Sequence, residues 1–308
     1  MSEKRKALVI SSLLGDSLAM PVHWIYDTSE IDQRFGRVEN LLYPPKSSYH
    51  GTRVAGELTH YGDQVMVLLK SVADNAGFDL SKFAEEWRKL FQDYKGYRDR
   101  ATKTTLSNFE EGKGPSNSGS PSTDLAGAGR IAPLVYCYAD DLEALILSCR
   151  AQTAMTHNNP MVIEASELSA ILVSKILAGS TPVSALKQLR DEAPNGSTPF
   201  GQWIEEGLKS TDEDTRKAIG KFGQSCAIKD AFRAVVHLVA KYQNNLREAL
   251  VENVMAGGDS AARGLLVGMF LAAYNGMNAL PAEWLSGLRS YRQIIDLLTQ
   301  VDAAKGVA

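Results

Sequence analysis

Residues 257–276 read GGDSAARGLLVGMFLAAYNG, and the pattern of small residues in this segment predicts how the chain packs. Asp259 or Ser260 can cap a helix that continues through the apolar run, because both side chains accept hydrogen bonds from the first helical amides. One face of that helix carries almost no side chains, since small residues recur at every fourth position: Gly264, Gly268 and Ala272. A neighbouring helix can approach such a face closely, which predicts a central helix over 259–275. The two glycines before Asp259 can also let a ligand reach the backbone.

Helical periodicity extends over the rest of the chain. In 81–94, SKFAEEWRKLFQDY, the apolar side chains fall three or four residues apart and form one stripe. The same pattern recurs in 141–154, 164–177, 227–241 and 289–300. No pair of segments alternates apolar and polar residues as a strand pair would. We therefore expect an all-α protein, with residues 1–308 folded as one single-domain bundle of helices.

Composition indicates which classes of partner to exclude and in which cellular compartment to expect the protein. A formal net charge of -3 gives no electrostatic reason to expect nucleic acid as a partner. No apolar stretch approaches the roughly 20 residues needed to span a membrane. The three cysteines are an odd number without a CxxC pair, which predicts buried, reduced thiols and a cytoplasmic protein. We therefore expect no nucleic-acid and no membrane partner, and the sequence leaves the oligomeric state open.

Four segments place polar residues where a helical core does not need them: 15–24 (GDSLAMPVHW), 59–66 (THYGDQVM), 156–160 (THNNP) and 257–264 (GGDSAARG). Each segment alone is explained by a helix cap or a turn, with Asp63 as a cap at a helix start. Together they place acids and imidazoles at helix boundaries, and a bundle that gathers these ends at one mouth has a site. Loops are predicted at 42–57, 112–123 and 194–199.

The order of these motifs resembles the ADP-ribosylglycohydrolase family. The resemblance rests on GDxLxxP at 15–21, the segment near residue 60, a Gly/Ser loop followed by GRIAPL, then TH and GGDS. It covers about residues 6–276. The family includes the dinitrogenase reductase-activating glycohydrolase, ADP-ribosyl-arginine and ADP-ribosyl-serine hydrolases, and the J1 crystallins. Membership implies an orthogonal all-α bundle and, in active members, a pair of Mg²⁺ or Mn²⁺ ions.

The chain departs from the family at the metal ligands. Active members resemble T-D-D-T where this sequence has Tyr61 to Gln64, and G-G-D-x-D-T where it has Gly257 to Ala262. One carboxylate remains in each segment, Asp63 and Asp259. Because Mg²⁺ takes six oxygen ligands and a two-metal site needs bridging carboxylates, these two acids can hold one weakly bound Mg²⁺ or Mn²⁺, or none.

Two further chemistries stay open from the residues alone. His23, His60 and His157 lie in the motif segments, and with the two acids they offer a mixed imidazole–carboxylate set suited to Zn²⁺. A metal-free alternative has Asp63 or Asp259 as general base with a histidine as partner. Arg263 is either a resident cation paired with one of the acids or a solvated surface arginine.

The resemblance implies two functions. In the first, the protein hydrolyses or binds an ADP-ribosyl or related nucleotide-ribose group, with Asp63, Asp259 and His23 as the catalytic residues. Its partner is then a small-molecule nucleotide or an ADP-ribosylated substrate. The residues assigned to substrate binding are Asp16, Tyr61, Gly127, Ala128, Gly129, His157, Asn158 and Ser260. In the second, the protein is a catalytically inactive member that binds ADP-ribose or serves a structural, crystallin-like role.

Overall fold

The computed structural model describes residues 2–192 and 198–306, and over these residues the protein is all-α, as predicted. The first half holds α1 (Ser2–Ala19), η1 (Met20–Val22), α2 (Thr28–Phe35), α3 (His60–Asp74), α4 (Leu80–Leu90), α5 (Arg100–Glu110), α6 (Ala126–Gly129), α7 (Ala132–Tyr138) and α8 (Leu142–Thr156). The second holds α9 (Pro160–Leu177), α10 (Pro182–Glu192), α11 (Phe200–Lys209), α12 (Thr215–Phe222), α13 (Ile228–Lys241), α14 (Leu246–Met255), α15 (Ser260–Asn275), η2 (Met277–Ala279), α16 (Ala282–Gly287) and α17 (Tyr291–Ala304).

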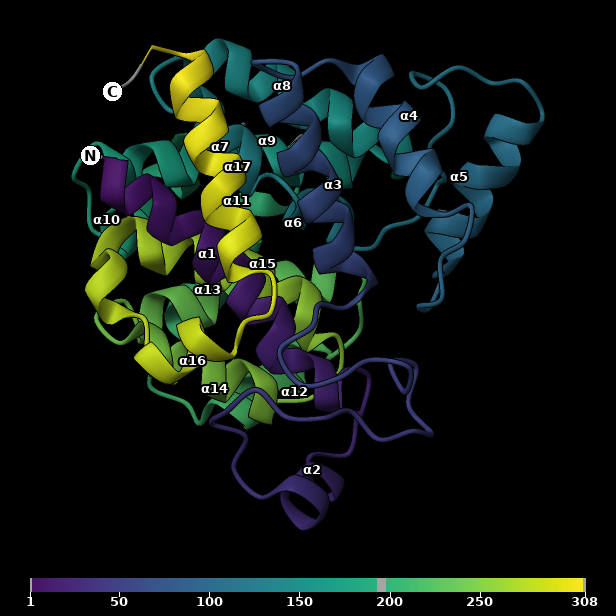
Figure 1. Cartoon of the computed structure of the whole chain (residues 1–308). Coiled ribbons are helices and arrows are strands. Elements are labelled where there is room, and N and C mark those ends of the chain that lie inside the picture. Colours follow the sequence, from purple (N-terminus) through teal and green to yellow (C-terminus); the bar gives the residue numbers. More distant parts are fainter. Residues whose placement is uncertain (1, 193–197, 307–308) are drawn as a thin grey trace.

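Helix α15 is the central helix that its glycines predict. It packs along α1 in the middle of the molecule, and α9, α13 and α14 cover its other sides (Figure 1). A Cβ atom on Gly264 would lie 2.5 Å from the carbonyl oxygen of Gly15, and one on Gly268 would lie 2.7 Å from the carbonyl carbon of Ser11. The two backbones therefore touch directly, which only glycine permits at these positions. This contact brings the start of α15 beside the end of α1.

The other predicted helices form within a few residues of their expected bounds, with one informative difference. The stripe over 81–94 predicts a helix to Tyr94, but α4 ends at Leu90. Phe83 and Trp87 are buried in the core, whereas Tyr94 leaves the helix and turns its hydroxyl to Asp63. The prediction that Asp63 begins its helix is also wrong. Helix α3 begins three residues earlier, at His60, and Thr59 caps it.

Loops cover one end of the helical bundle, called its mouth below, where Ser120 to Asp124 and Cys226 lie. Two single β-bridges, Ser120 with His157 and Asp124 with Ala227, fasten the predicted 112–123 loop and the residue after it to the end of α8 and the start of α13 in the described part of the chain. Residues 193–197 of the third predicted loop lie outside the described residues. Cys137 and Cys149 are buried free thiols as predicted, but Cys226 is only partly buried and faces this mouth. None of the helices within 2–192 and 198–306 has the length and apolar character that crossing a membrane requires.

Candidate functional site

Asp16 holds the start of α3 in place. It is fully buried in α1, and its carboxylate accepts hydrogen bonds from the backbone amide of Thr59 at 2.8 Å and from the Thr59 hydroxyl at 2.5 Å. Thr59 in turn caps α3 by accepting from the amide of Tyr61. Burial raises the pKa of Asp16 to about 7, although the two bonds from Thr59 act in the opposite direction. Asp16 therefore fixes the loop that carries His60 and Tyr61.

Asp259, His23 and His50 form a linear chain of contacts between polar side chains, which is called the base of the site below. His23 Nε2 lies 2.7 Å from Asp259 Oδ1, and His23 Nδ1 lies 2.8 Å from His50 Nε2. All three side chains are buried. Burial holds the pKa values of both histidines well below their usual range, so each ring is neutral at neutral pH. A neutral imidazole has one donor nitrogen and one acceptor nitrogen. His23 therefore donates a hydrogen bond to one of its two neighbours and accepts one from the other.

A second histidine–carboxylate pair lies beside the first. His60 Nε2 is 3.2 Å from Asp99 Oδ2, at an ion-pair distance but outside hydrogen-bond geometry. The ring of His60 stacks against that of His50, with centroids 5.8 Å apart, and is closed off from solvent. Burial acts to raise the pKa of Asp99, but the interaction with His60 and the amide of Thr102 outweigh it and hold that pKa below its usual range.

The glycine pair before α15 allows three chain segments to meet. Gly257 and Gly258 both adopt positive φ, and a Cβ atom on Gly258 would lie 2.5 Å from the side chain of Gln224. The backbone of this pair exchanges hydrogen bonds with the segment after η1: Trp24 N donates to Gly258 O, and Gly258 N donates to Ile25 O. The sequence predicts that a ligand can approach the backbone at these two glycines, but in the structure the segment after η1 occupies that position. This contact places His23 against Asp259.

Asp259 caps α15 from a fully buried position. Its Oδ1 accepts from the amide of Ala262 at 3.5 Å as well as meeting His23. Burial raises the pKa of Asp259 to about 6, while the charge of Arg263 acts in the opposite direction. Its Oδ2 atom has no hydrogen-bond partner among the described residues, and the same holds for the hydroxyl of the buried Ser260.

Arg263 is fully buried, so its interpretation as a solvated surface arginine is wrong. Its guanidinium donates from Nε to Asn253 Oδ1 at 2.9 Å, and from Nη2 to the carbonyl oxygens of Gly257 and Asn253. No ion pair within 4.0 Å joins it to Asp259 or Asp63, although the charge of Asp259 opposes the lowering of the Arg263 pKa by burial. The arginine is a resident cation near Asp259 without a direct salt bridge to it.

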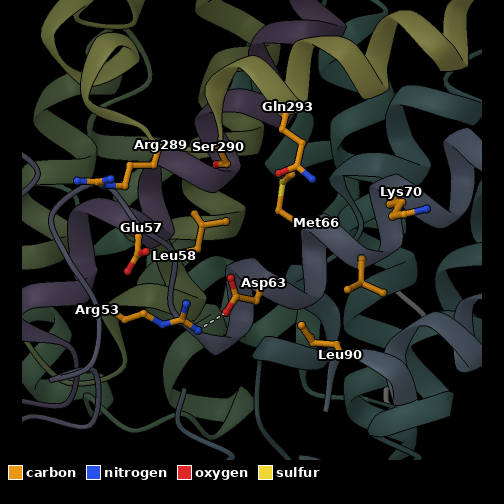
Figure 2. A pocket seen from close by; sticks show the side chains of 11 residues that line it. Arg53, Glu57, Leu58, Asp63, Met66, Lys70, Leu90, Arg289, Ser290 and Gln293 are labelled. Atoms are coloured by element: carbon orange, nitrogen blue, oxygen red, sulfur yellow. Dashed lines mark hydrogen bonds and ion pairs between the residues drawn. The ribbon is translucent and has the colours of Figure 1, made fainter. Parts of the chain in front are cut away.

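Asp63 faces another part of the molecule. Its Oδ2 accepts from Arg53 and from the hydroxyl of Tyr94. It lines a pocket of about 310 Å³ between α3 and α17, and Figure 2 shows Arg53 directed at its carboxylate. Burial raises the pKa of Asp63, and the Arg53 charge opposes that rise. Asp63 and Asp259 share no hydrogen-bond partner, so the contacts do not join the two acids that the sequence predicts to act together.

Residues 127–129, which the family resemblance assigns to substrate binding, make their backbone hydrogen bonds within their own short segment. Gly127, Ala128 and Gly129 form α6 and are buried, and their amides donate to the carbonyl oxygens of Asp124 and Leu125. These amides are therefore occupied rather than free for a phosphate group. Gly127 has a steric role instead, because a Cβ atom there would lie 2.6 Å from the ring of His157.

His157 is held by a buried polar network. Its Nδ1 lies 2.9 Å from the hydroxyl of Thr156, which accepts from Arg130. Burial, followed by the charge of Arg130, lowers the pKa of His157 to about 4. Its Nε2 is buried and has no partner within the described residues. Asn158 next to it is exposed, and only its backbone amide is engaged, by Ser120 O at 2.7 Å.

A pocket of about 630 Å³ opens at this mouth. Its lining comes from the start of α5, the loop after Ser120 and the partly buried thiol: Arg100, Ala101, Thr104, Ser120, Pro121, Ser122, Thr123, Asp124 and Cys226. The buried Tyr61 is not part of this lining, but the charge of Asp124, which is part of it, acts on Tyr61. Its pKa is raised by burial and then by the charges of Asp259, Asp99 and Asp124, so its hydroxyl is protonated and lies among these acids.

Three residues near this site were not predicted from the sequence: His50, Asp99 and Asp124. His50 lies in the predicted 42–57 loop, 27 residues after its partner His23. Asp99 caps α5 and accepts from the amide of Thr102 three residues on. That cap is a local pattern that could have been found, although nothing in it points to His60.

The residues present do not fit a two-metal centre. Asp63 is engaged by Arg53 and Tyr94, and Asp259 by His23. In residues 2–192 and 198–306, no three His, Cys, Asp or Glu side chains are placed to share one metal ion. That arrangement also leaves the mixed imidazole–carboxylate zinc set without support. His23 contacts Asp259, His60 lies near Asp99 and His157 contacts Thr156, so the three histidines do not share a common centre.

Comparison with known proteins shows the family to which this chain belongs. The sequence profile described as ADP-ribosylglycohydrolase matches residues 2–307, and the chain belongs to this family. Crystallin J1A of Tripedalia cystophora is 24% identical, with 97% of this chain and 96% of the crystallin aligned. The ADP-ribosyl-[dinitrogen reductase] glycohydrolase of Rhodospirillum rubrum is 29% identical over 51% of this chain and 49% of its own length.

A solved structure supports the same fold. A chain of the "ADP-ribosylglycohydrolase-related protein complex" superposes with a TM-score of 0.77 at 20% identity, and the match covers 98% of both chains. The orthogonal helical bundle expected from the sequence is therefore confirmed.

Proposed function

We propose that this protein binds an ADP-ribosyl or related nucleotide-ribose group in the pocket at the mouth, without a pair of metal ions. One observation carries the proposal: buried polar atoms in three of the four motif segments have no partner in the described residues. They are His60 Nδ1, His157 Nε2, Asp259 Oδ2, Ser260 Oγ and Arg263 Nη1. Leaving such an atom unpaired costs about 1–3 kcal/mol, and a ligand rich in hydroxyl groups satisfies donors and acceptors together.

Family membership supplies the ligand class. A relative carries the name ADP-ribosyl-[dinitrogen reductase] glycohydrolase, and the pocket of about 630 Å³ is within the size range of sites for nucleotide-sized molecules. We assign the ribose hydroxyls to the base, near Asp259 and Ser260. The rim offers the hydroxyls of Ser122 and Thr123 and the cationic Arg100 for the phosphates.

A structural, crystallin-like role is the second candidate. It is favoured by the closure of the base, since Asp259 and His23 are 0% and 3% exposed, and by the likeness to crystallin J1A along nearly the whole chain. A closed base also weighs against hydrolysis, because an attacking water has to reach the general base.

Titration calorimetry with ADP-ribose in EDTA tests the proposal. We expect saturable binding that EDTA leaves unchanged. Asp259→Asn should weaken binding by about tenfold or more, because the neutral amide loses a charge-assisted hydrogen bond. Asp212→Asn, which changes an exposed carboxylate outside the pocket, should bind as the unmodified chain does.

Two outcomes contradict the proposal. Absence of ADP-ribose binding to the unmodified chain would leave the structural role. Release of ADP-ribose from modified arginine or serine only when Mg²⁺ or Mn²⁺ is added would show a metal-dependent hydrolase instead.

A further inference from the structure

The guanidinium of Arg263 is fixed by the segment that precedes Asp259, from the end of α14 to the glycine pair. Asn253, at the end of α14, accepts from Nε and Nη2, and the carbonyl of Gly257 accepts from Nη2 at 2.5 Å. Asn253 is itself held, because its side-chain amide donates to Ser260 O at 2.8 Å. A planar group held by three hydrogen bonds has one orientation. Its remaining Nη1 has no partner in the part of the chain that the structure describes.

Among residues 2–192 and 198–306, this buried charge has no direct counterion. Burial lowers the pKa of Arg263 to about 10, so the group remains a cation at neutral pH. The strongest influence opposing burial is the charge of Asp259, yet no salt bridge joins the two. A cation placed this way acts on Asp259 through space, as a metal ion beside a carboxylate does, and it repels any second cation that approaches the same acid.

The space for a second metal carboxylate is closed as well. At Gly62, where active family members resemble an aspartate, a Cβ atom would lie 2.9 Å from Asp16 Cγ and 2.9 Å from Leu58 Cβ, and closer still to Asp16 Oδ2. Ala261 and Ala262 occupy the last two positions of the second metal segment, and both are fully buried in α15. The surrounding packing thus leaves no space for the metal ligands that this chain lacks, so restoring one of them by a single substitution would require the neighbouring residues to move.

We infer that Arg263 is a resident cation that takes the place of a divalent metal ion at Asp259, so that the site does not bind Mg²⁺ or Mn²⁺. Its Nη1 and the free Oδ2 of Asp259 then offer a donor and an acceptor to neighbouring hydroxyl groups of one ligand. This last step rests on the proposed function, whereas the exclusion of metal does not.

Mn²⁺ titration followed by electron paramagnetic resonance tests the exclusion directly. We expect no stoichiometric Mn²⁺ site in the unmodified chain. Arg263→Met should raise the affinity for Mn²⁺ by on the order of a hundredfold, because the repelling charge is gone while Asp259 remains. Arg263→Lys keeps the charge and should still exclude the ion. Arg130→Met removes an equally buried arginine from a different network and should not gain a Mn²⁺ site.

One result overturns the inference whatever the variants do: stoichiometric Mn²⁺ binding to the unmodified chain that Asp259→Asn abolishes. If Arg263→Met does not fold, the comparison of the unmodified chain with Asp259→Asn still decides, because equal absence of binding supports the exclusion. ADP-ribose binding in EDTA is measured separately. Its failure would remove the proposed ligand and leave the metal result standing.

Discussion

Gly62→Ala tests how tightly the start of α3 is fixed. The new Cβ atom would lie 2.9 Å from both Asp16 Cγ and Leu58 Cβ, whereas real Cβ contacts of this kind are almost never below 3.0 Å. Asp16 has little freedom to move, since both its oxygens are bonded to Thr59. Forcing an atom into a packed site costs about 1–3 kcal/mol, partly offset by the roughly 0.5–1 kcal/mol by which alanine favours a helix over glycine.

The net expectation is a loss of about 1–2 kcal/mol in the free energy of unfolding, measured by urea denaturation. Gly220→Ala is the matched control, because Gly220 lies on the exposed face of α12 with nothing within 4 Å of a new Cβ atom. It should gain about 0.5–1 kcal/mol. Gly62→Asp should be less stable than Gly62→Ala, since it adds a second acid beside buried Asp16, and Mn²⁺ should not restore its stability.

The reasoning would be refuted by Gly62→Ala unfolding at the same urea concentration as the unmodified chain. That result would mean that Asp16 and Leu58 yield without cost. A Mn²⁺-dependent gain in the stability of Gly62→Asp would refute the claim that the packing excludes a second metal carboxylate.

Three further predictions concern packing, protonation and Asp63. Gly264→Ala should lose more than about 3 kcal/mol in the free energy of unfolding. Its Cβ atom would lie 2.5 Å from the backbone of α1, and a backbone atom cannot rotate away as a side chain can. A loss below about 1 kcal/mol would show that α1 and α15 can separate freely. Burial lowers the pKa of His237 to about 4, so its contribution to stability is complete above pH 6.5 and is lost as pH falls through about 4. The unmodified chain should therefore lose about 1–2 kcal/mol more than His237→Gln between pH 7 and pH 5 in urea denaturation, and parallel losses would contradict this. Tyr94→Phe removes a hydrogen-bond donor to Asp63 and should lower the free energy of unfolding by about 1–3 kcal/mol in the same assay. ADP-ribose binding should stay unchanged. Weakened binding would place Asp63 in the ligand site.

Local patterns predicted the helices and the centre of the fold. The four-residue spacing of Gly264 and Gly268 predicted the close packing of α15, because steric room is a property of the residues themselves. The cap at Asp259 followed from its position before an apolar run. The helix over 81–94 was overextended because Tyr94 fits the apolar stripe, and only its distant contact with Asp63 removes it from the helix.

The site depended on contacts that no local pattern contains. Asp259 meets His23 across 236 positions of the chain, so their pairing is visible only in three dimensions. Asp63 and Asp259 look equivalent in sequence, yet Arg53 and Tyr94 hold the first while His23 holds the second. Arg263 was left between two interpretations because its burial is decided by Asn253, on another helix.

Crystals grown with Mn²⁺ and ADP-ribose give the most direct test of a metal-independent nucleotide-ribose site. Anomalous difference density at the manganese edge is the quantity to measure. We predict ADP-ribose in the pocket at the mouth, with a ribose hydroxyl at Asp259 and no anomalous peak near that carboxylate. An anomalous peak coordinated by Asp259, with Arg263 displaced, would contradict the account.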